Sequence, residues 1–66
     1  MAEIIKVYPN GDEAQCQSFD NDAAAEAHLR MMRQSYEDMG YTIKLDGLTF
    51  FVAVINGEEM RYEARS

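Results

Sequence analysis

Cys16 and His28 are the only cysteine and the only histidine of the chain, and their side chains are the best suited to nucleophilic or metal chemistry. One of each cannot supply the four ligands of a structural zinc site, so we expect no metal and no cofactor. A Cys16–His28 nucleophile pair is conceivable where a strand packs on a helix, but no third group is available to orient the histidine. We therefore expect Cys16 to be a small buried hydrophobe and His28 to lie on the flank of a helix.

Carboxylates are the most abundant reactive side chains, and many of them occur close together. The pairs are Asp12-Glu13, Asp20-Asp22, Glu37-Asp38 and Glu58-Glu59. Acid–base catalysis needs two carboxyl groups in a cleft that separates their pKa values, whereas these pairs fall on predicted turns and helix ends. The glycine-containing turns are not followed by helices, so they are not phosphate-binding loops. We expect the protein not to be an enzyme.

The chain is short and acidic. Its 66 residues are 47% hydrophobic and 27% charged, with twelve Asp and Glu against six Lys and Arg, and they carry a net charge of −6. This length predicts one domain, residues 1–66. Nucleic acids and anionic membranes attract Lys and Arg, so the charge argues against both as direct partners. The single cysteine, the absence of a leader after Met1 and the short apolar runs predict a cytoplasmic protein.

Three glycine-containing turns divide the chain into strands. Asn10-Gly11, Asp46-Gly47 and Asn56-Gly57 each lie between apolar or alternating stretches, as the tight turns of β-hairpins do. They predict strands at Glu3–Tyr8, Glu13–Phe19, Tyr41–Leu45 and Leu48–Ile55, and a fifth strand after Gly57.

Turn lengths decide which side chains of each strand face the core. We expect two-residue loops at Asn10-Gly11 and Asp46-Gly47. At the last turn a two-residue loop would pair Val52 with Arg61, so a three-residue loop, Ile55-Asn56-Gly57, is preferred. The pairs then expected on the core face are Val7–Ala14, Ile5–Cys16, Tyr41–Val52, Ile43–Phe50, Leu45–Leu48, Val52–Met60 and Phe50–Tyr62.

Residues Asp22–Met39 have the pattern of an amphipathic helix. Apolar side chains recur at intervals of four and three residues and form one buried stripe, which consists of Ala25, Leu29, Met32, Tyr36 and Met39. Any of Asp20, Asn21 and Asp22 can serve as the N-cap. Gly40 is expected to end the helix in the left-handed conformation.

The order ββαβββ predicts an α+β domain of two layers, a five-stranded antiparallel sheet with one helix packed on one face. The order of the strands within the sheet stays open, because the connection through the helix admits more than one arrangement. With the pairs given above, Ile4, Tyr8 and Phe51 fall on the outer, uncovered face of the sheet. Three apolar side chains together there predict a contact site for a second copy or for another protein.

Seven acidic residues are candidates for contact with a basic partner. They lie in predicted turns, at the helix end and on the last strand: Asp12, Glu13, Glu37, Asp38, Glu58, Glu59 and Glu63. Glu37 and Asp38 occupy the last turn of the helix, where the helix dipole disfavours negative charge. Carboxylates in such places can imitate phosphates, since both offer oxygen acceptors to Lys and Arg.

In size, in acidity and in the absence of a catalytic motif, the whole chain resembles the small phage-encoded anti-CRISPR proteins of the type I class. The resemblance lies in these gross features and in no short motif. It implies an inhibitor in the cytoplasm of the bacterial host, which occludes the DNA-binding surface of a surveillance complex by charge mimicry. The seven acidic residues would then contact Arg and Lys of a Cas subunit.

Three other functions are compatible with the sequence. A structural or regulatory homo-oligomer could associate through Ile4, Tyr8 and Phe51, with the acidity serving solubility alone. A small enzyme or redox protein could use Cys16. An RNA-binding domain could stack bases on the aromatic side chains of the open sheet face, although the few basic residues expected there oppose it.

Overall fold

The computed structural model describes all residues, 1–66. It contains β1 (Ala2–Val7), β2 (Glu13–Phe19), α1 (Asp22–Asp38), β3 (Thr42–Asp46), β4 (Phe50–Ile55) and β5 (Glu58–Arg65). The predicted α+β class and the order ββαβββ are confirmed. The bounds of β2 are those predicted, and α1 ends one residue earlier than expected.

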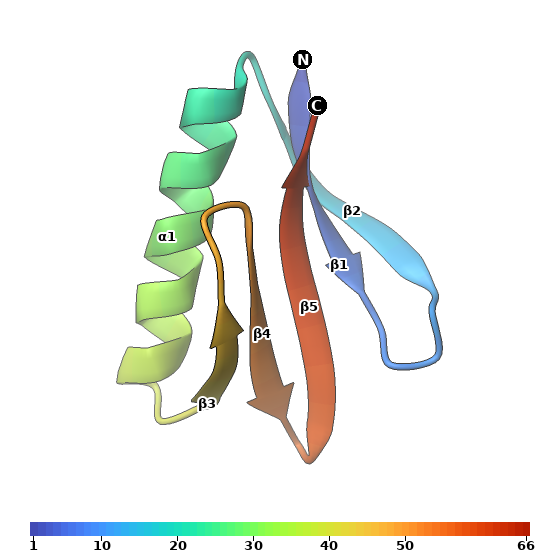
Figure 1. Ribbon diagram of the computed structural model, residues 1–66, viewed down its shortest axis with the longest axis vertical. Coiled ribbons are helices and arrows are strands. Elements are labelled where there is room, and N and C mark those ends of the chain that lie inside the picture. The colour runs from blue at the N-terminus through green and yellow to red at the C-terminus, as the bar shows by residue number, and fades with distance from the viewer.

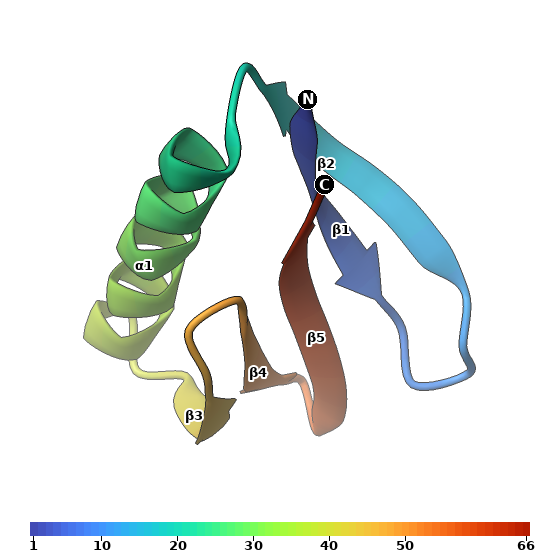
Figure 2. The ribbon, with the colours of Figure 1, turned by 45° about the horizontal axis from the view of Figure 1, so that its top comes forward.

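All five strands belong to one antiparallel sheet in the order β2-β1-β5-β4-β3. The first and last strands are therefore neighbours at the centre of the sheet, and both termini lie at the same end of the molecule (Figure 1). The helix α1 crosses one face of the sheet, which we call the inner face. No helix or strand covers the other, outer face (Figure 2).

The hydrophobic core lies between α1 and the inner face. It consists of Ala2, Ile4, Ala25, Leu29, Phe51, Ala53, Met60 and Tyr62. Ile4 and Phe51 are 0% and 1% exposed, and Tyr8 packs against the same cluster. The prediction that Ile4, Tyr8 and Phe51 form an apolar patch on the outer face is therefore wrong. Since side chains alternate along a strand, Ile5 and Val52 face outward instead.

The lengths of two turns explain this inversion. At the first hairpin the Tyr8 amide donates to the Asp12 carbonyl over 2.8 Å and the Gly11 amide donates to the Tyr8 carbonyl over 2.9 Å, so three residues form the loop. At the last hairpin Ile55 pairs with Glu58, which leaves a two-residue loop. Both predicted loop lengths were wrong by one residue, and a one-residue shift moves every side chain of a strand to the opposite face.

The middle hairpin also turns later than predicted. The Gly47 amide donates to the Phe50 carbonyl over 2.9 Å, so Leu48 and Thr49 form the tip instead of Asp46 and Gly47. A bulge at Lys44 interrupts the pairing of β3 with β4. Because of this extra residue, Ile43 pairs with Ala53 on the inner face, whereas Leu45 pairs with Val52 on the outer face.

Both ends of α1 are capped as the sequence indicates. The Asn21 side chain accepts a hydrogen bond of 2.8 Å from the Ala24 amide and is the N-cap. At the other end Gly40 has φ of 96°, its amide donates to the Glu37 carbonyl, and the Tyr41 amide donates to the Tyr36 carbonyl. This pair of bonds is a Schellman motif, so the predicted glycine cap is confirmed. Within the predicted stripe, only Met39 is exposed.

Candidate functional site

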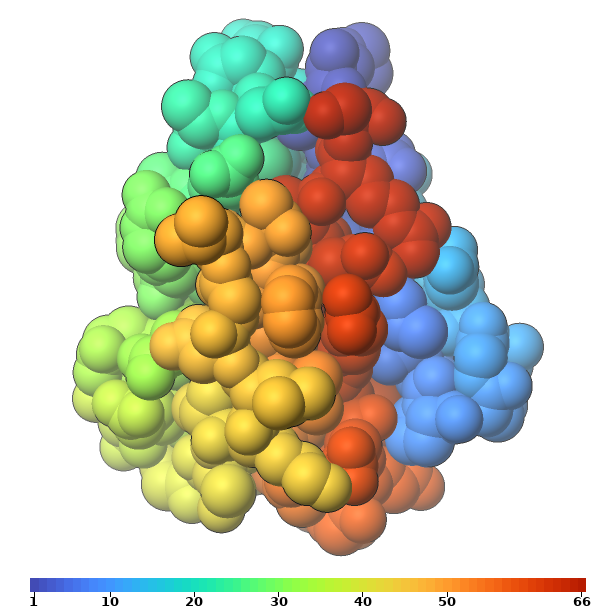
Figure 3. All heavy atoms as spheres, in the orientation of Figure 1, coloured from blue at the N-terminus to red at the C-terminus, as the bar shows by residue number.

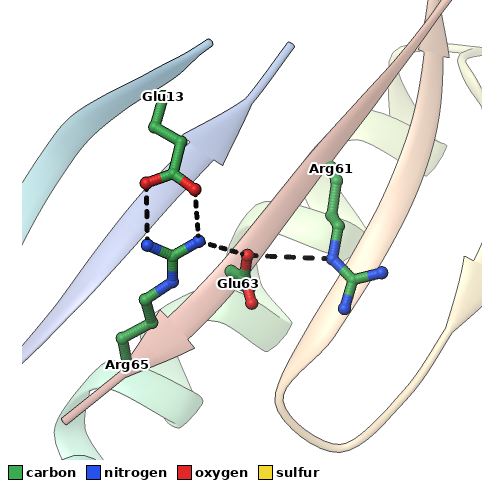
Figure 4. Close-up of polar contacts among 4 residues, drawn as sticks. All are labelled: Glu13, Arg61, Glu63 and Arg65. Carbon is green, nitrogen blue, oxygen red and sulfur yellow. Dashed lines mark hydrogen bonds and ion pairs between the residues drawn. The ribbon is translucent and has the colours of Figure 1, made fainter. Parts of the chain in front are cut away.

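A series of ion pairs crosses the outer face of the sheet (Figure 4). The Arg65 guanidinium donates two hydrogen bonds of 2.8 Å to the two carboxylate oxygens of Glu13 and a third of 2.8 Å to Glu63. Glu63 also lies 3.9 Å from the Arg61 guanidinium, which sits 4.2 Å above the centre of the Phe50 ring. Arg65 thereby joins β5 to the edge strand β2 across β1.

These contacts, with one more on the same face, use three of the carboxylates that were expected to bind a partner. The hydrogen bonds from Arg65 lower the pKa of Glu13, and the bonds to Glu13 and Glu63 raise the pKa of Arg65. Farther along the same face, Lys44 Nζ lies 2.7 Å from a carboxylate oxygen of Glu59. Glu13, Glu59 and Glu63 are therefore each paired with a cation of their own chain.

Seven carboxylates form no ion pair and supply most of the negative charge. They are Glu3, Asp12, Asp20, Asp22, Glu26, Asp38 and Glu58. Along the longest dimension of the molecule, 33 Å, they divide between its two ends. Asp12 adjoins the β1–β2 turn, Asp38 ends α1 and Glu58 begins β5, and these three segments all lie at the lower end in Figure 1.

We call Asp12, Glu37, Asp38 and Glu58 the acidic end. The helix terminus adds to its negative potential, because the last carbonyl groups of α1 point there and no basic residue occupies the last turn. The nearest cation of the helix, Arg33, lies 3.4 Å from Glu37 and 2.7 Å from Asp46. Asp38 accepts only a neutral hydrogen bond of 2.9 Å from Gln34. Folding thus brings four of the seven predicted contact residues to one end.

The acids at the opposite end of the molecule have a structural role at the start of the helix. Asp20 and Asp22 flank the N-cap of α1, where the positive end of the helix dipole stabilises carboxylates. Asp22 also accepts hydrogen bonds of 3.0 Å from the Ser66 hydroxyl and so holds the carboxyl terminus beside the helix. Helix stability accounts for these residues, whereas it opposes Glu37 and Asp38.

The two residues best suited to nucleophilic or metal chemistry, Cys16 and His28, lie apart from the acidic end. Cys16 is exposed at a bulge in β2, so the expectation that it is buried is wrong. His28 packs on the Phe19 ring with the centroids 5.2 Å apart and shares no hydrogen bond with Cys16. No group of three or more His, Cys, Asp or Glu side chains is close enough together to hold a metal ion. No helix has the length and apolar character that a membrane crossing requires.

Comparisons of the chain with protein families, with curated proteins and with solved structures gave no match.

Proposed function

We propose that this protein is a small acidic inhibitor that occupies a basic, nucleic-acid-binding surface of a larger protein. One observation supports this most directly. Unpaired carboxylates from the β1–β2 turn, from the end of α1 and from the start of β5 lie across the same end of the molecule, together with the negative pole of the helix (Figure 1). Asp38 in this position opposes helix stability, so its negative charge needs a reason other than folding.

The proposed mechanism is competition by charge. A basic surface that binds phosphates presents Arg and Lys side chains, which form equally good charge-assisted hydrogen bonds with carboxylates. The acidic end offers such acceptors on turns and a capped helix that are already ordered before binding. Little conformational entropy is then lost on association, and nucleic acid is excluded from the same surface.

In its more specific form, the proposal is an anti-CRISPR protein that acts in the cytoplasm of a bacterial host. A type I surveillance complex binds DNA through Arg and Lys of its Cas subunits, and the acidic end would occupy part of that surface. Support for this form comes from the small size, the acidity and the resemblance in these features to type I inhibitors.

Displacement of DNA from a purified type I surveillance complex tests the specific form. The decisive variant neutralises the acidic end with Asp12→Asn, Asp38→Asn and Glu58→Gln. A matched control neutralises the opposite end with Glu3→Gln, Asp20→Asn and Glu26→Gln, which changes the net charge equally. We expect the wild type and the control to displace DNA at low salt, the acidic-end variant to fail, and displacement to weaken at high salt.

The same three proteins test the general form. Tagged protein is used to capture partners from a bacterial lysate at low and high salt, and the captured proteins are identified by mass spectrometry. A nucleic-acid-binding protein retained by the wild type and the control, but not by the acidic-end variant, would support the proposal. Equal retention by both triple variants would mean that the acidic end is not the contact site.

A further inference from the structure

The outer face has buried apolar side chains although no helix or strand covers it. Ile5 and Val52 are buried there, and because nothing packs over the face, the long side chains of β5 must cover them. Cross-strand pairing sets Leu45, Val52, Arg61 and Val7 side by side in one row across four strands. Leu45, at one end of this row, remains 53% exposed.

A shallow groove of about 680 Å³ runs beside this row. Val7 and Pro9 line one side, Leu45 and Val52 line the other, and Arg61 lies between them. The groove exists because β1 pairs with β5 only as far as Val7 and Arg61, while β5 itself begins three residues earlier. In the space-filling view the β1–β2 turn (blue) and the β4–β5 turn (orange) form separate projections at the lower end (Figure 3).

The outer face carries little of the net charge of the protein. Strand pairing and ion pairs place four carboxylates and three cations on it: Glu3, Glu13, Glu59, Glu63, Lys44, Arg61 and Arg65. The remainder of the chain therefore carries five of the six net negative charges. Two copies of this protein repel each other least when they meet through their outer faces.

The size of the outer face is close to that of a stable interface. Five strands about 4.8 Å apart and a central strand of about eight residues at about 3.3 Å each give a flat area of roughly 600 Å². A standard interface buries about 800 Å² on each partner. Protruding side chains make the accessible area of the face larger than its flat area. Two copies that meet through their outer faces would thus bury an area in the lower range of specific interfaces.

We infer that two copies of the chain associate through their outer faces about a two-fold axis, with Leu45 of each copy inserted into the groove of the other. Such an isologous contact uses the same patch twice, as two-fold symmetry requires. It buries the exposed apolar side chain of each copy and surrounds it with ion pairs that are already formed. Of the acidic end, only Glu58 lines the groove, whereas Asp12, Glu37 and Asp38 lie outside it. The inference therefore goes beyond the proposed function and leaves most of the acidic end free.

The charges of the outer face disfavour nucleic acid as its occupant. Its three cations, Lys44, Arg61 and Arg65, each lie within 4 Å of a carboxylate of the same chain. A phosphate backbone would have to displace those carboxylates before it could contact the cations. A second copy needs no such exchange.

Sedimentation equilibrium of the purified full chain over a wide concentration range tests the inference. Three exposed side chains allow a matched set of variants: Leu45→Asp on the outer face, Leu48→Asp at the β3–β4 tip and Met31→Asp on α1. Leu48 and Met31 are 85% and 65% exposed, so each change adds one negative charge at an exposed site. We expect a micromolar dimer that Leu45→Asp weakens by about tenfold or more, while the two controls stay close to the wild type.

Two results would overturn the inference. One is a wild-type protein that remains monomeric at all concentrations, and the other is equal weakening by all three variants. In the first case, capture of a different protein that Leu45→Asp abolishes would assign the outer face to that protein instead of a second copy.

Salt separates this inference from the proposed function. Self-association of an acidic chain strengthens as salt screens the repulsion between copies, whereas binding of the acidic end to a basic partner weakens. Loss of DNA displacement in the acidic-end variant with an intact dimer would leave both ideas standing. A monomeric wild type that still displaces DNA would reject only the dimer, and a dimeric wild type that never displaces DNA would reject only the specific function.

Discussion

The hydroxyl oxygens of Tyr36 on α1 and Tyr62 on β5 lie 3.1 Å apart and join the helix to the inner face of the sheet. Their rings are 5.4 Å apart, and the Tyr62 ring also stacks on Phe51 at 5.1 Å. Burial, reinforced by the hydrogen bond with Tyr36, raises the pKa of Tyr62 above its usual value. The neutral phenol is thus the form that the folded protein stabilises.

This raised pKa predicts a loss of stability in alkali. A group whose pKa is higher in the folded state stabilises the fold below its unfolded pKa, about 10 for tyrosine, and loses that contribution as the pH rises further. Tyr62→Phe should remove this alkaline loss and should lower the free energy of unfolding at neutral pH by about 0.5–1.5 kcal/mol. Urea denaturation at neutral and alkaline pH measures both effects.

Tyr36→Phe is the control for the alkaline prediction. It removes the same hydrogen bond but leaves Tyr62 buried, and burial is the larger cause of the shift. The alkaline loss should therefore persist in Tyr36→Phe. Its disappearance there would mean that the hydrogen bond, and not burial, holds the phenol neutral.

The placement of Phe51 on the inner face predicts a large core effect. Phe51→Ala should lower the free energy of unfolding by about 3–5 kcal/mol, because it leaves a cavity under α1. Leu48→Ala, at the exposed hairpin tip, should change it by no more than about 0.5 kcal/mol. If denaturant midpoints of the two variants were alike, Phe51 would not be a core residue; Phe51→Leu extends the comparison should Phe51→Ala fail to fold.

The sequence predicts the helix and the strands of this fold, but not how the strands pair. The helix bounds, its caps and the five strands follow from local signals such as Asn21, Gly40 and the glycine turns. Local signals do not show which side chains of β1 and β4 face the core, because Ile4 and Ile5 are both apolar and Phe50–Ile55 is apolar throughout. Such strands show no alternation, so only the turn lengths assign their faces.

The correct turn lengths have local signals in the sequence. Pro9 before Asn10-Gly11 suits the second position of a type I turn that is followed by a left-handed glycine, which is a three-residue loop. Asn56-Gly57 without a proline suits a two-residue type I′ turn. The acidic end was only partly predictable, because a one-dimensional sequence does not reveal which carboxylates, such as Glu13 and Glu63, meet an arginine.

The last turn predicts a specific response to substitution. Asn56 and Gly57 have φ of 53° and 81°, as a type I′ turn requires. Gly57→Ala should lower the free energy of unfolding by about 1–2 kcal/mol, because an alanine side chain strains the left-handed conformation. Asn56→Gly should be nearly neutral. Equal stability of the wild type and Gly57→Ala, measured by thermal denaturation, would rule out this turn type.

The ion pair of Glu13 with Arg65 predicts a loss of stability in acid. A carboxyl group whose pKa is lower in the folded state stabilises the fold above its unfolded pKa, about 4.3 for glutamate, and this contribution disappears as the pH falls through the folded value. Glu13→Gln should therefore reduce the drop in melting temperature between neutral pH and pH of about 3. An unchanged drop would show that the pair does not persist in solution.

Asp38 provides a prediction in which stability and binding move in opposite directions. Asp38→Lys should stabilise the isolated protein by about 0.3–1 kcal/mol, since a cation suits the carboxyl end of a helix, and should weaken binding to a basic partner. Asp20→Lys, beside the N-cap, makes the same charge change at the opposite end. It should destabilise the protein by a similar amount and leave binding intact. Urea denaturation and DNA displacement on the same samples compare the two variants. If Asp38→Lys gained stability and kept full inhibitory activity, the acidic end would have no role in binding.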